Sequence, residues 1–322
     1  MSENALSNMP ILAFDFGGTR GRCGLASPEG HHAHVAMLER QPDEDGAAWL
    51  ARLLATGKTV RANARNLQAV AISFGGPVTP EGRVVSTHVS GWEKVDLRQQ
   101  MKLAFGVPVH IENDGNAGAV GEHRFGAGRG TRHMAYFTVS TGIGGGVVLD
   151  GKLYRGAHGL AGEFGHMVMH PGPNAPQYAA GKPGVLEALA SGPAIAREGR
   201  AALQRLGRNT AMGARLDALT CKDVFAAAEA GEVWAIVVRD EAIAHLARGV
   251  AAVICAYDVE LVVIGGGVSQ AGEALFGPLR AAVNRYLPYY QEGKPRVVQA
   301  SLGDAAPMLG AVAATADEVL RK

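Results

Sequence analysis

The chain is poor in cysteine, in long apolar runs and in net charge, and each shortage excludes a class of protein. Its three cysteines, Cys23, Cys221 and Cys255, lie far apart in 322 residues and form no C-x-x-C pair. We therefore expect neither a disulfide framework nor a cysteine-based zinc site. No apolar run approaches the ~18 residues of a membrane span, and no secretion signal begins the sequence. These features predict a soluble protein of a reducing, cytoplasmic compartment.

The formal net charge is only +1, which predicts no electrostatic attraction to nucleic acid or to an anionic membrane. Apolar residues make up 47% of the chain and charged residues 19%, as in an ordinary globular protein with a core. The length fits two domains of roughly 150 residues each.

Glycine is abundant, with 44 residues, about twice its average share of ~7%. The glycines cluster at residues 17–18, 75–76, 142–146 and 265–267. Because adjacent glycines lack Cβ atoms, their backbone N–H groups are able to approach a ligand closely. The clusters therefore predict ligand-binding turns.

One arrangement occurs twice along the chain. Residues 11–26 and residues 134–149 each contain an apolar strand, a glycine turn and a second strand. In the first copy, Asp15 stands between the apolar strand and the turn. Two such copies predict two related α/β lobes, each directing a glycine-lined turn at one shared ligand.

Elsewhere, strand and helix patterns alternate, which predicts an α/β architecture. Short β-rich runs predict strands at residues 69–74, 107–112, 261–264 and 297–300. Helical periodicity predicts helices at residues 46–54, 97–105, 116–123, 185–206, 233–256 and 306–320. Thr220 and Asp223 form a capping-box pattern for one more helix, and residues 170–183 are rich enough in Pro, Gly and Ala to predict a long loop.

Two common nucleotide-binding fingerprints are not matched. Gly57-Lys58-Thr59 resembles the end of a P-loop, but that motif needs a glycine at position 52, which is Arg. The pattern G-x-G-x-x-G fails at residues 126–131 and at 142–147, and neither segment opens a helix after a strand.

A pair of glycine hairpins fits a polyphosphate better. Their N–H groups supply donors, and Thr19 and Thr141 supply hydroxyls. Asp15 is then placed to hold Mg²⁺ beside the phosphates, and Arg20 to neutralise charge. A third turn at residues 265–267 suits an adenosine moiety, although a strand-to-helix turn with no ligand explains it equally well. The candidate nucleotide-binding residues are Asp15, Gly17, Gly18, Thr19, Arg20, Thr141, Gly142, Gly144, Gly145, Gly265, Gly266 and Gly267.

Two further groups of polar residues each have two explanations. Asp114 follows a strand and precedes a helix, so it is either a helix N-cap or a general base in phosphoryl transfer. Glu163 and His166, three residues apart, suit the hydroxyls of a polyol or form a partly buried structural pair. His166 and His170 have metal-ligand spacing, but no cysteine or carboxylate completes a site, so no metal is expected there.

Together, these motifs resemble the ROK family of sugar kinases and sugar-responsive repressors, within the actin/hexokinase-like superfamily, with bacterial glucokinases as the most similar members. Five motifs of the family have a match in this chain. D-x-G-G-T matches residues 15–19, E-N-D-x-N matches residues 112–116, and the second phosphate motif matches residues 141–146. G-E-x-G-H matches residues 162–166, and G-G-G matches residues 265–267.

The resemblance implies a two-lobed α/β fold of the actin/hexokinase type, a duplicated ribonuclease H-like fold with its active site in the interlobe cleft. The expected small lobe is residues 1–115 plus 307–322, and the large lobe is residues 116–306. The resemblance also implies ATP and Mg²⁺ as cofactors, a homodimer, and Asp114 as the catalytic base. The implied sugar contacts are Gly76, Asn113, Asp114, Glu163, His166 and Glu187.

The chain departs from the family at its structural zinc site, C-x-C-G-x-x-G-C-L-E. Tyr178, Ala180 and Val185 stand where the cysteines would be, so zinc is predicted to be absent. His88 also stands where many members place a sugar-contacting Asn.

The expected activity is that of an ATP:hexose phosphotransferase, with Asp114 deprotonating the 6-hydroxyl of glucose to give glucose 6-phosphate. Fructose, allose, N-acetylmannosamine and N-acetylglucosamine are alternative substrates. A sugar-responsive transcriptional regulator is the alternative of another class. It is disfavoured because only fourteen residues precede Asp15, too few for a helix-turn-helix domain.

Overall fold

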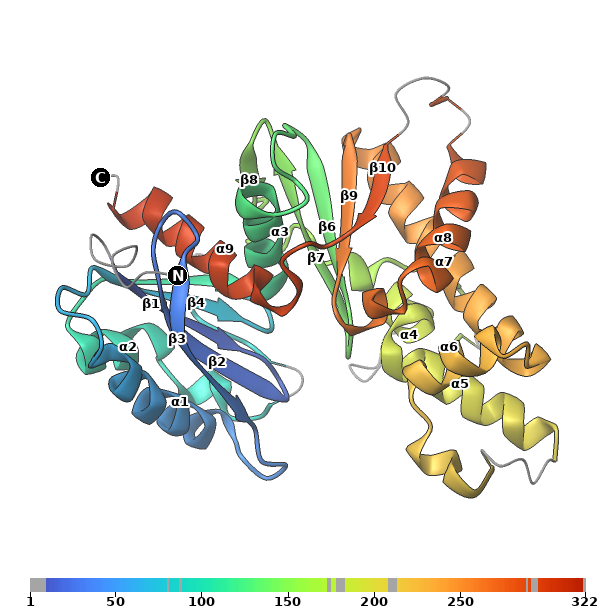
Figure 1. Ribbon diagram of the computed structural model, residues 1–322, viewed down its shortest axis with the longest axis horizontal. Helices are drawn as coiled ribbons and strands as arrows, with labels where there is room; N and C mark the ends of the chain where they lie inside the picture. The colour runs from blue at the N-terminus through green and yellow to red at the C-terminus, as the bar shows by residue number, and fades with distance from the viewer. Residues whose placement is uncertain are drawn as a thin grey trace. The chain divides into compact units, whose positions relative to one another are not determined.

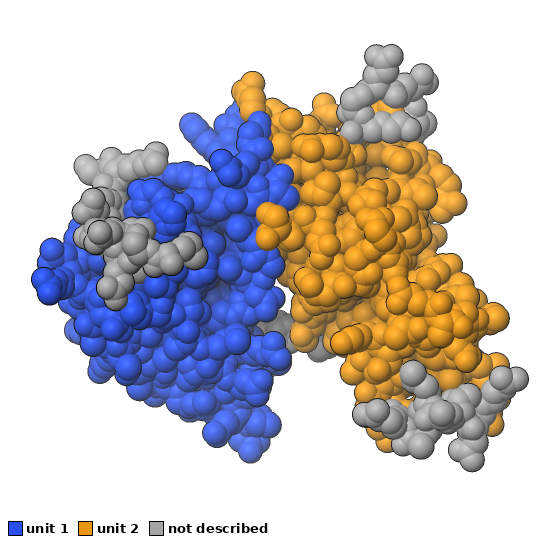
Figure 2. Space-filling model, in the orientation of Figure 1, with its two compact units in different colours: residues 1–130, 146–162, 302–322 blue, residues 131–145, 163–301 orange. Residues whose placement is uncertain are grey.

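The computed structural model describes residues 10–79, 81–86, 89–172, 175–177, 183–207, 213–287, 289–290 and 295–320. His88, Tyr178 and Ala180 lie outside these residues. The chain forms two compact units, coloured separately in Figure 2. The first unit comprises residues 1–130, 146–162 and 302–322, and the second comprises residues 131–145 and 163–301. The lobe boundaries implied by the family resemblance, residues 1–115 plus 307–322 and residues 116–306, stay a prediction.

The first unit is built on a five-stranded sheet in the order β3-β2-β1-β4-β5 (Figure 1). β1 pairs antiparallel with β2 and parallel with β4, and β4 pairs parallel with β5. The strands are β1 (Ile11–Phe16), β2 (Arg20–Ala26), β3 (His32–Glu39), β4 (Ala69–Phe74) and β5 (Val109–Asn113). The carboxyl ends of β1, β4 and β5 therefore lie side by side at one edge of the sheet.

Alternation along β1 divides its side chains between two cores. Leu12, Phe14 and Phe16 belong to a core that α1 (Gly46–Arg61) and α2 (Leu97–Phe105) help to form on one face. Ile11 and Ala13 belong to a second core with α3 (Asp114–Phe125) and α9 (Ala306–Thr315) on the other face. By the same alternation, Asp15 is on the face that carries α3 and α9.

The α3–α9 contact depends on two glycines. A Cβ atom at Gly310 would lie 1.6 Å from the carbonyl oxygen of Ala117, and one at Gly121 would lie 2.3 Å from that of Ala306. Both distances are shorter than any real Cβ contact, so only glycine permits this separation of the helix axes. The packing fixes the position of α3 and of the residues at its N-terminus.

The second sheet has the order β10-β9-β6-β7-β8. Its strands are β6 (Met134–Val139), β7 (Ile143–Leu149), β8 (Lys152–Tyr154), β9 (Leu261–Gly265) and β10 (Arg296–Gln299). The helices of the second unit are α4 (Leu186–Ala190), α5 (Gly192–Arg205), α6 (Cys221–Glu229), α7 (Val233–Tyr257) and α8 (Glu273–Tyr286). α7 packs against each of the other four.

Short helical turns connect these elements. The 3₁₀ turns are η2 (Trp92–Lys94), η3 (Phe164–His166), η4 (Gly213–Ala218), η5 (Gly267–Ala271) and η6 (Gly303–Ala305), and η7 (Ala316–Leu320) is a π turn that continues α9. Within the described residues, no helix is both long and apolar enough to cross a membrane.

The element predictions hold with three main corrections. The strands at residues 69–74 and 134–139 and the capping box of Thr220 with Asp223 are confirmed. The single helix expected at residues 185–206 is wrong, because Ser191 is extended and caps a new helix there. The helix expected at residues 306–320 leaves α geometry after Thr315, and the one expected at 46–54 continues to Arg61.

Candidate active site

Asp15 lies at the carboxyl end of β1 and is held by the neighbouring strand. The hydroxyl of Ser73, in β4, donates a hydrogen bond of 2.9 Å to Asp15 Oδ1. Burial raises the pKa of Asp15 above its ordinary value, and the Ser73 hydrogen bond and the nearby Arg22 charge offset this only in part. Arg22 itself bonds the Asp304 carboxylate at 2.6 Å. Asp15 is therefore an oriented carboxylate of the kind that binds a hard cation.

The first glycine turn follows the last residue of β1 and is shaped by backbone contacts. The N–H of Gly17 donates to the carbonyl of Arg20 at 3.0 Å, and a Cβ atom at Gly17 would lie 2.6 Å from that oxygen. Arg40 fixes the turn from outside: its backbone N–H donates to Thr19 O at 2.9 Å, and its Nε donates to Gly18 O at 2.7 Å. Sequence reasoning missed Arg40, for which no local motif exists.

Arg20, predicted to neutralise phosphate charge, stands at the surface. Its Nε lies 3.8 Å from Glu39 Oε1, and both side chains are largely exposed. An exposed pair of this kind contributes little to stability. The role expected for Arg20 stays a prediction.

Asp114 is the first residue of α3, and Asn113 is the N-cap. Asn113 Oδ1 accepts the N–H of Asn116 at 3.0 Å, so the explanation of Asp114 as the N-cap is wrong. Asn113 Nδ2 donates to Gly76 O at 3.0 Å and to Asp114 Oδ1 at 3.3 Å. Three predicted residues, Gly76, Asn113 and Asp114, thus lie together at the ends of β4 and β5.

The buried carboxylate of Glu112 accepts hydrogen bonds from residues of this segment. Its Oε1 accepts the Asn113 N–H and the Asn116 side-chain amide, each at 3.1 Å. Its Oε2 accepts Arg155 Nε at 2.9 Å. Burial raises the pKa of Glu112, but the His110 imidazole and the Arg155 charge outweigh it, so the pKa is lowered overall. A charged Glu112 therefore holds both ends of the Asn113–Asn116 segment.

The second glycine turn is shorter than expected, because β7 begins at Ile143 and takes Gly144, Gly145 and Gly146 into the strand. The turn that remains, residues 140–142, is fixed within the second unit. The N–H of Ser140 donates to Gly142 O at 2.8 Å, and the N–H of Gly192 donates to Ser140 O at 2.9 Å. The N–H of Ile143 donates to Glu187 Oε2 at 2.7 Å. A Cβ atom at Gly145 would lie 2.3 Å from Tyr136 O, so this glycine allows β7 to lie against β6.

Glu163, His166 and Glu187 come together, as the sequence predicts. Glu163 Oε2 lies 3.6 Å from His166 Nε2 across the short turn η3. Burial raises the pKa of Glu163, the His166 charge lowers it, and the Glu187 charge raises it further, with a net increase. Carboxylates and an imidazole in one cluster suit the donor and acceptor needs of sugar hydroxyls.

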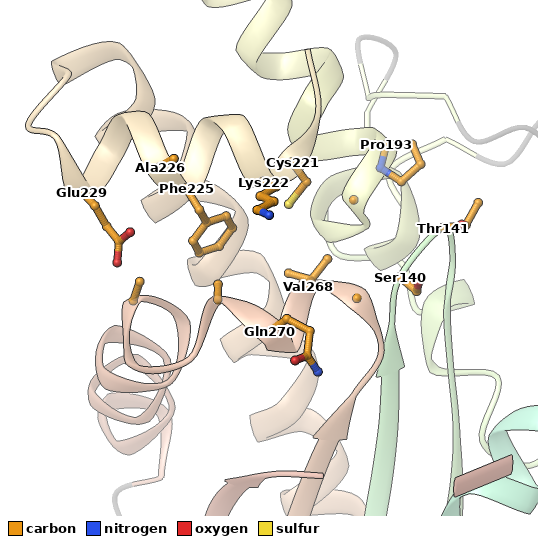
Figure 3. Close-up of a pocket in the computed structure, with 14 residues that line it drawn as sticks. Ser140, Thr141, Pro193, Cys221, Lys222, Phe225, Ala226, Glu229, Val268 and Gln270 are labelled. Atoms are coloured by element: carbon orange, nitrogen blue, oxygen red, sulfur yellow. The ribbon is translucent and has the colours of Figure 1, made fainter. Parts of the chain in front are cut away.

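A cavity of about 680 Å³ opens beside the second glycine turn (Figure 3). It is lined by Ser140, Thr141, Gly192, Pro193, Cys221, Lys222, Phe225, Ala226, Glu229, Gly267, Val268, Gln270, Ala271 and Ala274. Its size and its mixed apolar and polar walls are typical of small-molecule sites. The ring of Phe225 points from α6 toward the segment that carries Val268.

Two of the predicted nucleotide residues, Thr141 and Gly267, line this cavity, whereas Gly265 and Gly266 have packing roles. A Cβ atom at Gly265 would lie 2.5 Å from the Tyr136 hydroxyl. Gly266 has φ +85° and would place a Cβ atom 2.5 Å from Val139 O. A direct contact of these two glycines with a nucleotide stays a prediction.

The family resemblance implies a structural zinc site, and one of its cysteine positions lies within the described residues. Val185 stands at one of its cysteine positions, is 1% exposed and has no ligating atom. Within the part of the chain that the structure describes, no three His, Cys, Asp or Glu side chains are grouped so as to hold a metal ion. The absence of zinc stays a prediction.

Comparison with known proteins gives consistent matches over nearly the whole chain. The ROK family model matches residues 11–318. A glucokinase of Thermotoga maritima is 35% identical over 310 residues, which cover 95% of this chain and 97% of that one. This confirms the resemblance that the motifs indicated.

Solved structures confirm the expected fold. A ROK hexokinase from Thermus thermophilus superposes with a TM-score of 0.82 at 32% identity, covering 98% of this chain and 100% of that one. A ROK glucokinase from Streptomyces griseus, in complex with glucose and AMPPNP, has a TM-score of 0.81 at 29% identity and covers 94% of this chain and 98% of that one.

Proposed function

The chain belongs to the ROK family, and we propose that it is an ATP-dependent hexose kinase that converts glucose to glucose 6-phosphate. One observation carries the proposal: Asp15 at the end of β1, the 75–76 turn after β4 and Asp114 after β5 stand at the carboxyl ends of three adjacent parallel strands. Ligands of α/β sheets bind outside such carboxyl ends. The proposal assigns one carboxylate, Asp15, to a cation and another, Asp114, to a proton.

Asp114 is the proposed catalytic base. Phosphoryl transfer passes through a loose transition state, so catalysis depends mainly on positioning and on charge. Asn113 supplies the positioning, because its amide bridges Gly76 O and Asp114 Oδ1. Asp114 would accept the proton of the attacking sugar hydroxyl as the bond from the sugar oxygen to the γ-phosphorus forms and the bond from the γ-phosphorus to the β,γ-bridging oxygen breaks, so that ADP leaves.

Mg²⁺ and ATP are the proposed cofactors. The oriented carboxylate of Asp15 fits Mg²⁺, which prefers a few carboxylates together with substrate phosphates. When bound, the ion neutralises charge on the β- and γ-phosphates. The cavity beside Thr141 fits a nucleotide, since Phe225 and Val268 supply apolar surface for a base and Lys222 supplies a cation. The AMPPNP complex of the Streptomyces griseus relative supports ATP as the nucleotide.

The sugar is proposed to contact Gly76, Asn113, Glu163, His166 and Glu187. Glucose is favoured because the Thermotoga maritima relative is named a glucokinase and the Streptomyces griseus relative was solved with glucose. A cytoplasmic location, a homodimer and the lobe boundaries 1–115 plus 307–322 and 116–306 are proposed from the family resemblance. Analytical ultracentrifugation tests the homodimer.

A coupled ADP-release assay over a panel of hexoses and N-acetylhexosamines, with and without Mg²⁺, tests the proposal. We expect Mg²⁺-dependent ADP release that glucose stimulates most strongly. Stronger stimulation by fructose or by an N-acetylhexosamine would correct the substrate but keep the reaction. If no sugar stimulates ADP release, the protein is not a hexose kinase.

A further inference from the structure

Glu187 has a contact that a sugar ligand does not need. It lies on α4, is 7% exposed, and its Oε2 accepts the N–H of Ile143 at 2.7 Å. Ile143 is the residue that directly follows the second glycine turn, 140–142. The acceptor is thus a buried carboxylate, and hydrogen bonds from a backbone N–H to such a group are short and strong.

The same carboxylate also fits tightly against the turn itself. A Cβ atom at Gly142 would lie 2.7 Å from Glu187 Oε2 and 3.4 Å from Oε1. A side chain at position 142 would therefore displace either the carboxylate or the turn. Gly142 has no positive φ, so its need for glycine comes from this contact rather than from its backbone conformation.

The chain just beyond α4 fixes the other end of the turn. α4 ends at Ala190, and the N–H of Gly192, two residues on, donates to Ser140 O at 2.9 Å. Glu187 and Gly192 therefore hold the turn at its two ends. Ser140, which makes one of these contacts, and Thr141, which lies between them, line the 680 Å³ cavity.

We propose that Glu187 is a positioning residue for the nucleotide: its bond to Ile143 keeps the 140–142 turn in the shape that binds ATP, whether or not sugar is present. The inference rests on the proposed kinase function and adds to the sugar contact expected for the same side chain. A residue that only contacted sugar would not affect nucleotide affinity in the absence of sugar.

Isothermal titration with AMPPNP and Mg²⁺, in the absence of sugar, tests the proposal. Glu187→Ala leaves the buried Ile143 N–H without its acceptor, and we expect the Kd for AMPPNP to rise about tenfold. Glu187→Gln retains an amide oxygen that is able to accept from Ile143, so its Kd should stay within about threefold of wild type, while its turnover of glucose falls.

Glu198→Ala is the matched control. Glu198 lies on α5 in the same unit, partly exposed, and its carboxylate bonds to the adjacent Arg197. Its removal should leave the Kd for AMPPNP unchanged. Thermal unfolding of each variant confirms that it is folded.

A double-mutant cycle supplies a second measurement that does not depend on Glu187→Ala alone. Gly142→Ala should weaken AMPPNP binding in the wild-type background, because its methyl group meets the carboxylate. In the Glu187→Ala background that contact is gone, so the two effects should not add.

The outcomes separate the inference from the function on which it rests. If wild-type protein does not bind AMPPNP, the proposed kinase function fails. If wild type binds AMPPNP and both Glu187→Ala and Gly142→Ala bind it as tightly as wild type does, the positioning role is wrong and the kinase proposal stands. Equal weakening in Glu187→Gln and Glu187→Ala would show that charge, rather than the Ile143 bond, matters, and would also overturn the inference.

Discussion

Replacing Glu112 by Gln tests whether a buried charge supports the proposed catalytic segment. Glu112 is 4% exposed, and its Oε2 bonds Arg155 while its Oε1 bonds the Asn113 N–H. Gln keeps the shape and one acceptor oxygen, but its NH₂ group cannot accept from Arg155. The substitution therefore removes the charge-assisted pair with Arg155, weakens the interaction with His110, and keeps the shape of the side chain.

The expected loss of stability follows from the exposure of the two partners. Breaking a fully buried ion pair costs about 3–5 kcal/mol. The Arg155 side chain is 38% exposed and also contacts Glu318. Solvent and the Glu318 carboxylate therefore still stabilise the Arg155 charge in the variant. We expect the free energy of unfolding to fall by about 2 kcal/mol at pH 7.5.

The pH dependence of this difference has a definite sign. The pKa of Glu112 in the folded state is lowered below its ordinary value of 4.5. The stability that its charge contributes is thus complete above pH 4.5 and is lost as the pH falls through the folded-state pKa. The difference in the free energy of unfolding between wild type and Glu112→Gln should therefore have its full value at pH 7.5 and should decrease below pH 4.5.

Urea denaturation of both proteins at several pH values measures the gap. Glu198→Gln is a suitable control, because its carboxylate is 41% exposed and pairs with the 40% exposed side chain of Arg197 on α5. Its stability should change by less than about 0.5 kcal/mol. A Glu112→Gln variant as stable as wild type at pH 7.5, or a gap that widens in acid, would refute the reasoning.

Three other perturbations test separate parts of the account. Ser73→Ala removes the hydrogen bond that favours charged Asp15, so the pKa of Asp15 should rise, and the acid limb of the Mg²⁺-dependent pH–rate profile should move to higher pH; an unmoved limb would contradict the role of Asp15. Lys222→Ala should raise the KM for ATP about tenfold by removing one cation from the cavity, as initial rates at varied ATP would show, and an unchanged KM would place the nucleotide elsewhere. Gly310→Ala should destabilise the protein by about 3 kcal/mol or more, because its methyl group would lie 1.6 Å from Ala117 O; thermal unfolding measures the loss, and a stable variant would contradict the close α3–α9 packing.

Local patterns predicted much of the fold. Apolar runs located β4 and β6 because those strands are buried on both faces and carry few polar residues. The Thr220 capping box located the start of α6 because its two hydrogen bonds join residues three apart. The break at Ser191 was missed, although Ser followed by Gly and Pro is a capping signal in retrospect.

The candidate site was predictable only where its residues lie close together in the sequence. Asn113 and Asp114 were found together, but which of them caps α3 was decided by side-chain directions that the sequence does not specify. The Arg155–Glu112 bond joins residues 43 positions apart, and the Glu187–Ile143 bond joins residues 44 apart. No local pattern indicates such partners, because tertiary packing alone brings them together.

The most direct test of the central claim is single-turnover phosphorylation of glucose by Asp114→Asn protein saturated with ATP and Mg²⁺. If Asp114 accepts the proton of the sugar hydroxyl, the rate of glucose 6-phosphate formation should fall about 10²- to 10⁴-fold, while AMPPNP still binds as in wild type. A variant that forms product at the wild-type rate would contradict the assignment of Asp114 as the base.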